Sequence, residues 1–279
     1  MQKEEDYIDL LRVFFEVIEA NKGTLAEDDN RVLDAEGLAI KCFGHACSLL
    51  YLLRGTNVPD LGAAFFDPGS INVIGRAMLE SFLVFYYLFV DPQNIEEETF
   101  RYHCWIYKDL LEKQGFPALS PEGKEGLEAE KSVIRNIKNK IEANGFFAKL
   151  TPKQKQNLIE GREWRFKGWK KIAISAGLSE LHSDSFYSYL CSYAHAGSLC
   201  VHQMRQAETA AHQRGLVGAT MGLAMICMAY MTKAYCTYFP KPCSLLEENE
   251  NHKEKIQMWL EIGASNLDEV DIDWDAVSG

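Results

Sequence analysis

The sequence predicts an all-α fold, a multi-helix bundle with a charged helical insertion between two core halves. Apolar residues recur at spacings of three and four along most of the chain, which is the period of an amphipathic helix. Residues typical of helix starts and ends, such as Ser, Thr, Pro and Gly, stand between these stretches. No stretch of any length alternates apolar and polar residues in the manner of a strand.

Three long helices are expected in the first core half. Residues 4–20 carry a wide apolar stripe, and residues 30–54 become strongly apolar in their second half. A loop rich in glycine and proline follows. Ser70 is a suitable N-cap for the third helix, residues 71–90, and Pro92 marks its end.

A charged middle segment and the second core half follow. Residues 96–114 are amphipathic, whereas residues 121–144 are charged with few apolar anchors, which indicates an exposed helix. Thr151 is a suitable N-cap, and Pro152 is a suitable first helical residue. The further expected helices are residues 164–176, 185–206, 216–239 and 253–262.

These elements indicate a single helical-bundle domain over residues 1–243, and an acidic helix and tail over residues 244–279. Within the domain, residues 121–171 form the basic, mostly exposed insertion. The formal net charge is −11, of which residues 244–279 contribute −8 (two basic, ten acidic), whereas residues 131–171 carry +9 (twelve basic, three acidic). The two charged segments either attract each other, serve different partners or are solvated faces.

The cysteines and the N-terminal segment bear on the compartment. The eight cysteines contain no C-x2-C pair, so there is no zinc-ribbon spacing. Five of them lie in apolar helical stretches, where a free cysteine acts as a small hydrophobe. Residues 1–11 are acidic and amphipathic, unlike a signal peptide. We therefore expect reduced thiols in the cytoplasm.

One apolar run is weighed as a membrane span. Residues 216–232 (LVGATMGLAMICMAYMT) carry no charge. The run is shorter than the ~20 residues that a span usually needs, and it is rich in small residues and methionine. We therefore expect a buried core helix and no membrane partner. A bundle so rich in apolar helices is also a candidate homodimer.

A charged pair stands inside the apolar helix 71–90. Arg76 and Glu80 are four residues apart, so they lie one turn apart on one face. Such a pair costs free energy in so apolar a helix unless partners satisfy it. Those partners mark either a structural polar network or a functional site.

A polar stripe follows the expected helix 185–206. Ser188, Ser192, His195 and His202 lie at spacings of four, three and seven, on a helix otherwise suited to a core. A glutamate beside a histidine can orient the imidazole for work as a general acid or base, and the alternative is a satisfied internal network. The candidate catalytic residues are Arg76, Glu80, Ser192 and His195.

Basic and aromatic residues interleave shortly before this stripe. Such a pattern can bind phosphates and stack on RNA bases. The same pattern at helical spacing also buries tryptophan and phenylalanine and exposes lysine. The candidate nucleic-acid-binding residues are Arg162, Trp164, Arg165, Lys167, Trp169 and Lys170.

Several cofactor and catalytic motifs do not occur. The sequence holds no Walker-type phosphate loop, no G-x-G-x2-G turn after a strand and no G-x-S-x-G elbow. Metal sites in bundles tend to use Glu-x2-His on facing helices, and neither this spacing nor His-x3-His occurs in the expected core helices. We expect neither a metal nor a cofactor.

Over roughly residues 38–233 the chain resembles a bacterial all-helical family of unknown function. Its members pair an R-x3-E helix with a later Trp-containing helix and a Y-x2-S-x2-H-x2-S segment. The matching residues here are Arg76-Ala-Met-Leu-Glu80, Trp169 and the segment YLCSYAHAGS at residues 189–198. The resemblance implies candidate positions but no mechanism.

More distantly, the chain is similar to the HEPN superfamily, many of whose members are ribonucleases of toxin or anti-phage systems that use R-x4-6-H. The positions that would hold this arginine before His195 are serine, tyrosine and leucine. Arg205-x6-His212 fits the literal spacing, at an expected helix end. The resemblance implies either that Arg76 substitutes from a neighbouring helix or that the chain is a non-catalytic relative.

Besides a sensor for a small anionic ligand at Arg76, the sequence leaves two functions open, and with them whether the chain is an enzyme. The first is a binding, interaction or regulatory module with a buried Arg/Glu/His network, which engages RNA or a protein. The alternative is a HEPN-like ribonuclease or nucleotide-acting enzyme in stress or anti-phage defence. In that enzyme His195 would be the acid/base, Arg76 would bind a phosphate and Glu80 would orient the histidine. We rank the binding module first.

Overall fold

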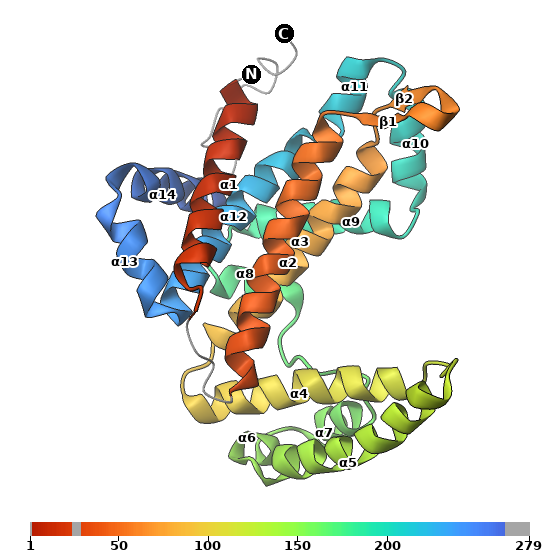
Figure 1. Cartoon of the computed structure of the whole chain (residues 1–279), viewed down its shortest axis with the longest axis vertical. Helices are drawn as coiled ribbons and strands as arrows, with labels where there is room; N and C mark the ends of the chain where they lie inside the picture. The colour runs from red at the N-terminus through yellow and green to blue at the C-terminus, as the bar shows by residue number, and fades with distance from the viewer. Residues whose placement is uncertain (1, 24–28, 266–279) are drawn as a thin grey trace. The chain divides into compact units, whose positions relative to one another are not determined.

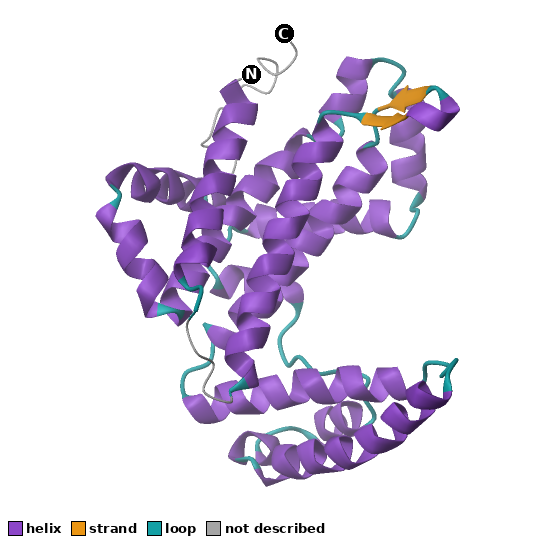
Figure 2. Cartoon of the chain, viewed as in Figure 1, coloured by secondary structure: helices purple, strands orange, loops and turns teal. Residues whose placement is uncertain are grey.

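A computed structural model of the chain describes residues 2–23 and 29–265. Helices make up most of the described residues (Figure 2). The all-α class predicted from the sequence is therefore confirmed. The chain folds into two compact units, one of Met1–Val90 with Trp169–Gly279 and one of Asp91–Gly168 (Figure 1). The domain boundaries expected from the sequence stay predictions.

Two apolar helices form the centre of the first unit. α3 (Pro68–Phe89) and α12 (Gly218–Tyr238) pack against each other and are buried along most of their length. α2 (Asn30–Leu53) packs along α3, while α1 (Gln2–Ala20) and α14 (Glu250–Ala264) pack on α12 (Figure 1). Shorter helices complete the unit: α8 (Trp169–Ser175), α11 (Ala210–Gly215) and α13 (Pro240–Glu248).

Among the described residues, two stretches are long and apolar enough to cross a membrane, Pro68–Phe89 and Ala210–Tyr238. Within the unit, 61% and 67% of their most apolar windows are buried by protein. Core helices of soluble bundles pass the same test of length and composition, so these helices are weak evidence for a membrane. Residues 216–232, weighed above as a span, lie mainly within the core helix α12.

The start of α3 differs from the prediction. Asp67 is its N-cap, because the Asp67 side chain accepts a hydrogen bond from the backbone N–H of Ser70 at 3.0 Å. Pro68 occupies the first turn, where a missing N–H costs nothing. The prediction of Ser70 as the N-cap is therefore wrong by one turn. The end of the helix at Val90 agrees with the prediction.

The loop between α2 and α3 contains a small hairpin that the sequence did not predict. β1 (Thr56–Val58) pairs antiparallel with β2 (Ala63–Phe65), and a 3-10 turn, η1 (Pro59–Leu61), joins them. Each strand has three residues, which is too short to show an alternating pattern.

The expected helix 185–206 is interrupted. A π-helical turn, η2 (Leu181–Ser185), leads into α9 (Phe186–Ala194), and α10 (Ser198–Gln206) begins only after a break. The prediction of one continuous helix is therefore wrong. His195 is the C-cap of α9, whereas His202 belongs to α10.

A Schellman turn makes this break. The N–H of Gly197 donates to the carbonyl of Ser192 at 2.7 Å, and the N–H of Ala196 to that of Tyr193 at 3.4 Å. Ala196 has a φ of 50°, in the left-handed region where glycine is usual. Because an alanine takes this position, the sequence carries no ordinary helix-end signal there.

The second unit has its own helices and apolar core. α4 (Ile95–Gln114), α5 (Pro121–Ala143), α6 (Gly145–Ala148) and α7 (Pro152–Ile159) agree with the expected helices where these were predicted. α5 is mostly exposed, as its charge indicates. The buried cluster consists of Phe100, Cys104, Tyr107, Ile137, Ile141 and Leu158.

A buried ion-pair network closes one end of this unit. Arg101 contacts Asp91 and Glu97, each at 2.5 Å, and Lys167 contacts Asp91 at 2.6 Å. The side chains of Arg101 and Asp91 are only 6% and 8% exposed. The charges of Arg101 and Asp91 are therefore well shielded from water, and each depends on its partners.

Candidate functional site

Arg76 and Glu80 meet two residues of the α9 segment. Arg76 Nε donates to Glu80 Oε1 at 3.0 Å, and Arg76 Nη1 lies 2.9 Å from His195 Nε2. The hydroxyl of Tyr187 donates to the same Glu80 Oε1 at 3.0 Å. The Arg76 guanidinium carbon also lies 5.6 Å from the centre of the Tyr187 ring. We call these four residues the α3–α9 network.

The α3–α9 network lies at the surface of the unit, not deep inside it. The side chains of Arg76 and Glu80 are 19% and 32% exposed, and His195 is exposed. The sequence predicted a buried network, so its depth is corrected here. The pair is satisfied by a tyrosine and a histidine, and it also keeps contact with water.

The network shifts the pKa values of two of its members. Burial disfavours the charged form of Arg76, but Glu80 together with Tyr187 and Cys191 outweighs it, so the pKa of Arg76 is raised. Burial and then the negative charge of Glu80 raise the pKa of Tyr187 to about 12. Near neutral pH the network thus holds a charged arginine and a neutral tyrosine.

The partners of His195 differ from those expected. Glu80 was expected to orient the imidazole, but its partners in the structure are Arg76 and Tyr187. Arg76 reaches His195 instead. Since a guanidinium has only donors, His195 Nε2 must accept this hydrogen bond and carries no proton while it lasts.

Ser192 and His202 do not join the network. The backbone carbonyl of Ser192 serves the Schellman turn after α9. His202 Nδ1 and Nε2 lie 3.1 Å from Arg205 Nη2 and 3.3 Å from Gln206 Nε2, all on α10. The structure therefore brings together Arg76, Glu80 and His195, but not the whole stripe. Sequence reasoning missed Tyr187, one of several tyrosines nearby that no spacing distinguishes.

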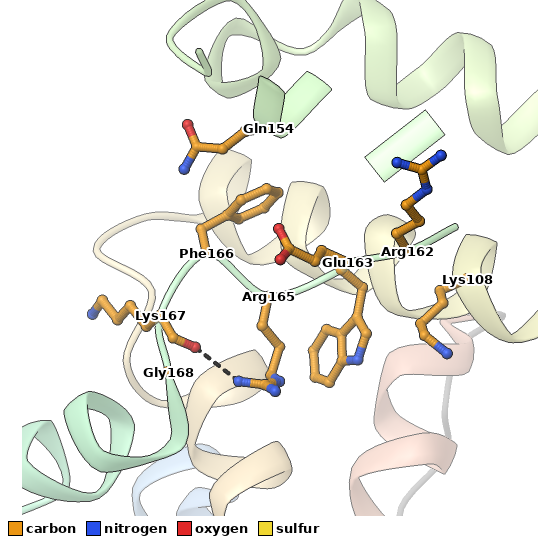
Figure 3. A pocket seen from close by; sticks show the side chains of 9 residues that line it. Lys108, Gln154, Arg162, Glu163, Arg165, Phe166, Lys167 and Gly168 are labelled. Atoms are coloured by element: carbon orange, nitrogen blue, oxygen red, sulfur yellow. Dashed lines mark hydrogen bonds between the residues drawn. The ribbon is translucent and has the colours of Figure 1, made fainter. Parts of the chain in front are cut away.

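The basic and aromatic segment is divided between the two units. The expected helix 164–176 begins only at Trp169, and residues 162–168 form a loop. This loop lines a cavity of about 410 Å³ (Figure 3). Trp169 and Lys170 begin α8 of the first unit, where Lys170 pairs with Asp184 at 2.8 Å. The cavity is lined by Lys108, Gln154, Arg162, Glu163, Trp164, Arg165, Phe166, Lys167 and Gly168.

The described residues hold no group of three or more histidine, cysteine, aspartate and glutamate side chains arranged for a metal ion. The chemistry available in the α3–α9 network is therefore that of a guanidinium, a carboxylate, a phenol and an imidazole.

Comparison with known proteins places the chain in a family. A family model described as a family of unknown function (DUF5677) matches residues 37–210, which include α3, the whole second unit and α9. No curated protein and no solved structure matches the chain. Since the match covers more than half of the chain, the protein belongs to the DUF5677 family.

Proposed function

We propose that this protein is a binding or regulatory module in which the α3–α9 network is a structural latch. The main support for this proposal is that the Arg76 guanidinium contacts both Glu80, at 3.0 Å, and His195, at 2.9 Å. Arg76 and Glu80 come from α3, while Tyr187 and His195 come from α9 and its C-cap. The network therefore fastens α9 against α3 near both of its ends.

The same contacts disfavour catalysis at His195. A general base must accept a proton, and Nε2 already accepts a hydrogen bond from a permanently charged guanidinium. A proton placed there would break that bond and stand beside a positive charge. Tyr187 cannot replace the histidine as a base near neutral pH, because its pKa is about 12.

A HEPN-like ribonuclease is the second candidate, and one observation favours it. His195 is exposed and lies beside an arginine, so a phosphodiester could approach both groups. In that reading Arg76 stabilises the phosphate and His195 transfers the proton.

RNA cleavage separates the two candidates. Wild type, His195→Ala and His202→Ala are incubated with labelled tRNA and total RNA, and their folding is checked by thermal melting. His202 is a matched control, because it is an exposed histidine outside the network. We expect no cleavage by any of the three. Cleavage by wild type and by His202→Ala, but not by a folded His195→Ala, would establish the ribonuclease instead.

The cysteines support a reducing compartment for this module. All eight form no disulfide, and five of them are buried: Cys42, Cys104, Cys200, Cys227 and Cys236. We therefore propose that the protein acts in the cytoplasm.

A further inference from the structure

The cavity of the second unit has the size and the walls of a small-molecule site. Its volume of about 410 Å³ falls in the range typical of ligand pockets. Lys108 comes from α4 and Gln154 from α7, while the loop of residues 162–168 supplies the rest of the wall (Figure 3). A residue of α4 thus meets the α7 helix and the loop that follows it around one space.

The wall is rich in basic side chains, of which Lys167 pairs with Asp91 and Lys108 with Glu112. It carries four cationic side chains and one acidic one, Glu163. Residues 91–168 as a whole hold fourteen basic and thirteen acidic residues, so this unit is +1 and the rest of the chain is −12. An anion is therefore repelled less by this nearly neutral unit than by the acidic rest of the chain. The four cations are Lys108, Arg162, Arg165 and Lys167.

The two arginines of the wall differ in how firmly their guanidinium groups are held. Arg165 Nη1 donates to the carbonyl of Lys167 at 2.9 Å, and its guanidinium lies 5.8 Å from the Trp164 ring centre. These contacts fix its orientation. The Arg162 side chain is 65% exposed and pairs with Glu160 at 2.7 Å. Such an exposed pair is weak, so Arg162 can turn to a phosphate at little cost.

The same wall offers surfaces for a flat ring. The Phe166 ring is held in place by stacking on Phe100, at 5.7 Å between centres and 16° between planes. Trp164 and Arg165 present a second planar pair. Gln154 Oε1 accepts from Thr151, so the Gln154 amide nitrogen is the group that can donate to a base edge.

We propose that this cavity binds a nucleoside phosphate, with the phosphate on Arg165, toward which Arg162 turns from the other side of the loop, and the base against the aromatic residues (Figure 3). The nucleoside phosphate is either a free nucleotide or one unit of an RNA strand, and both share this chemistry. The site belongs to the second unit alone and does not depend on whether the α3–α9 network is a latch.

Isothermal titration calorimetry of the full chain tests this site. The probes are ADP, adenosine, inorganic phosphate and a short oligoadenylate, and the proteins are wild type, Arg162→Gln, Arg165→Gln and Arg135→Gln. Arg135 is the matched control, because it is an exposed arginine on α5 that does not line the cavity. Thermal melting confirms that each variant is folded.

We expect saturable binding of ADP to wild type, with weaker binding of adenosine and of phosphate. Arg162→Gln and Arg165→Gln should each weaken ADP binding by about tenfold, the effect of losing one hydrogen bond between charged groups, while Arg135→Gln should not. Tighter binding of oligoadenylate than of ADP, lost in the same two variants, would identify RNA as the source. Binding of oligoadenylate that is equal to or weaker than that of ADP would identify a free nucleotide as the source.

Three results would overturn the assignment. They are no saturable binding of ADP or oligoadenylate, inorganic phosphate binding as well as ADP, or equal weakening by Arg135→Gln. None of them bears on RNA cleavage or on the stability of the α3–α9 network, so the two proposals fail separately.

Discussion

At the scale of single residues, exposure decides what each charged contact contributes. Arg101 and Asp91 are nearly hidden from water, whereas Arg76 and Glu80 keep 19% and 32% of their side-chain surface. Breaking a buried pair leaves an uncompensated charge, while a half-exposed charge can be solvated again. Substitutions in the ion-pair network of Arg101 and Asp91 should therefore lower the free energy of unfolding more than substitutions in the α3–α9 network do.

Asp91→Asn should lower the free energy of unfolding by about 2–4 kcal/mol, because it removes a carboxylate that compensates the buried charge of Arg101, although the contact with Glu97 remains. Urea unfolding measures this loss. The control is Glu128→Gln, which removes an exposed pair with Lys131 and should change stability by less than about 0.5 kcal/mol. Equal effects of the two variants would contradict the buried network.

The pH dependence of stability should reflect Asp91 as well. Burial alone would raise the pKa of Asp91, but Lys167 and Arg101 outweigh it and lower that pKa below its ordinary value. Because the pKa of Asp91 is lower in the folded than in the unfolded protein, ionised Asp91 stabilises the fold at pH values above its unfolded pKa of about 4. This stabilisation is lost as the pH falls through the folded pKa. Acid unfolding followed by circular dichroism should be shallower in Asp91→Asn. If stability depends on pH in the same way in Asp91→Asn and in wild type over the acid range, Asp91 is not the group responsible for the acid sensitivity.

The sequence predicted three residues of the α3–α9 network, but not its contacts. Arg76 and Glu80 were visible because charge is rare in an apolar helix, and His195 because it belongs to a polar stripe on a helix otherwise suited to a core. Their pairing depends on how α9 lies on α3, which no local pattern contains. For that reason Tyr187 was missed, and the expected contact between Glu80 and His195 was wrong.

At the scale of elements, backbone geometry at two glycines and one alanine shapes the first unit. Ala196 has a left-handed φ, and a Cβ on Gly197 would come within 2.6 Å of Ser192 Oγ. A Cβ on Gly75 would overlap the Thr220 side chain, so Gly75 allows α3 and α12 to approach closely. These positions fix where α9 ends and how the two core helices pack.

The two residues of the Schellman turn should respond in opposite directions. Ala196→Gly should raise stability by about 0.5–1 kcal/mol, because glycine adopts a left-handed φ without strain. Gly197→Ala should lower it by about 1–3 kcal/mol through overpacking against Ser192. Differential scanning calorimetry of both variants checks the signs. A gain from Gly197→Ala would contradict the turn.

Gly75→Ala should destabilise the first unit by about 1–3 kcal/mol, because Thr220 is buried and hydrogen-bonded to Asn72 and cannot move aside freely. The matched control is Gly37→Ala on α2, where a Cβ meets nothing within 4 Å. There the helix propensity of alanine should raise stability by up to about 1 kcal/mol. Chemical denaturation measures both, and the same sign for both would refute the close helix contact.

Helices were predicted well where the apolar period is long, as for α2, α4 and α12, because burial of one face dominates their stability. The elements that were predicted wrongly are either short or determined by backbone conformation. The hairpin β1–β2 has too few residues for a pattern, and the break after α9 rests on an alanine in a conformation that favours glycine.

At the scale of the whole molecule, the DUF5677 match spans both candidate sites. The α3–α9 network lies in the first unit and the cationic cavity in the second, and each is complete within its own unit. The charge of the chain is divided in the same way, with +1 on residues 91–168 and −12 elsewhere. The proposed latch in the first unit and the proposed nucleoside-phosphate site in the second are both consistent with a ligand-binding module.

The central claim is that Arg76, Glu80, Tyr187 and His195 form a structural latch, and a double-mutant cycle of Glu80→Ala and Tyr187→Phe tests it most directly. Urea unfolding gives the free energy of each variant. We expect Glu80→Ala to cost about 1–2 kcal/mol and the double variant to lose about 1 kcal/mol less than the sum of the single variants, since both remove one shared hydrogen bond. Additive effects within a few tenths of a kcal/mol, with little loss from Glu80→Ala, would contradict the latch.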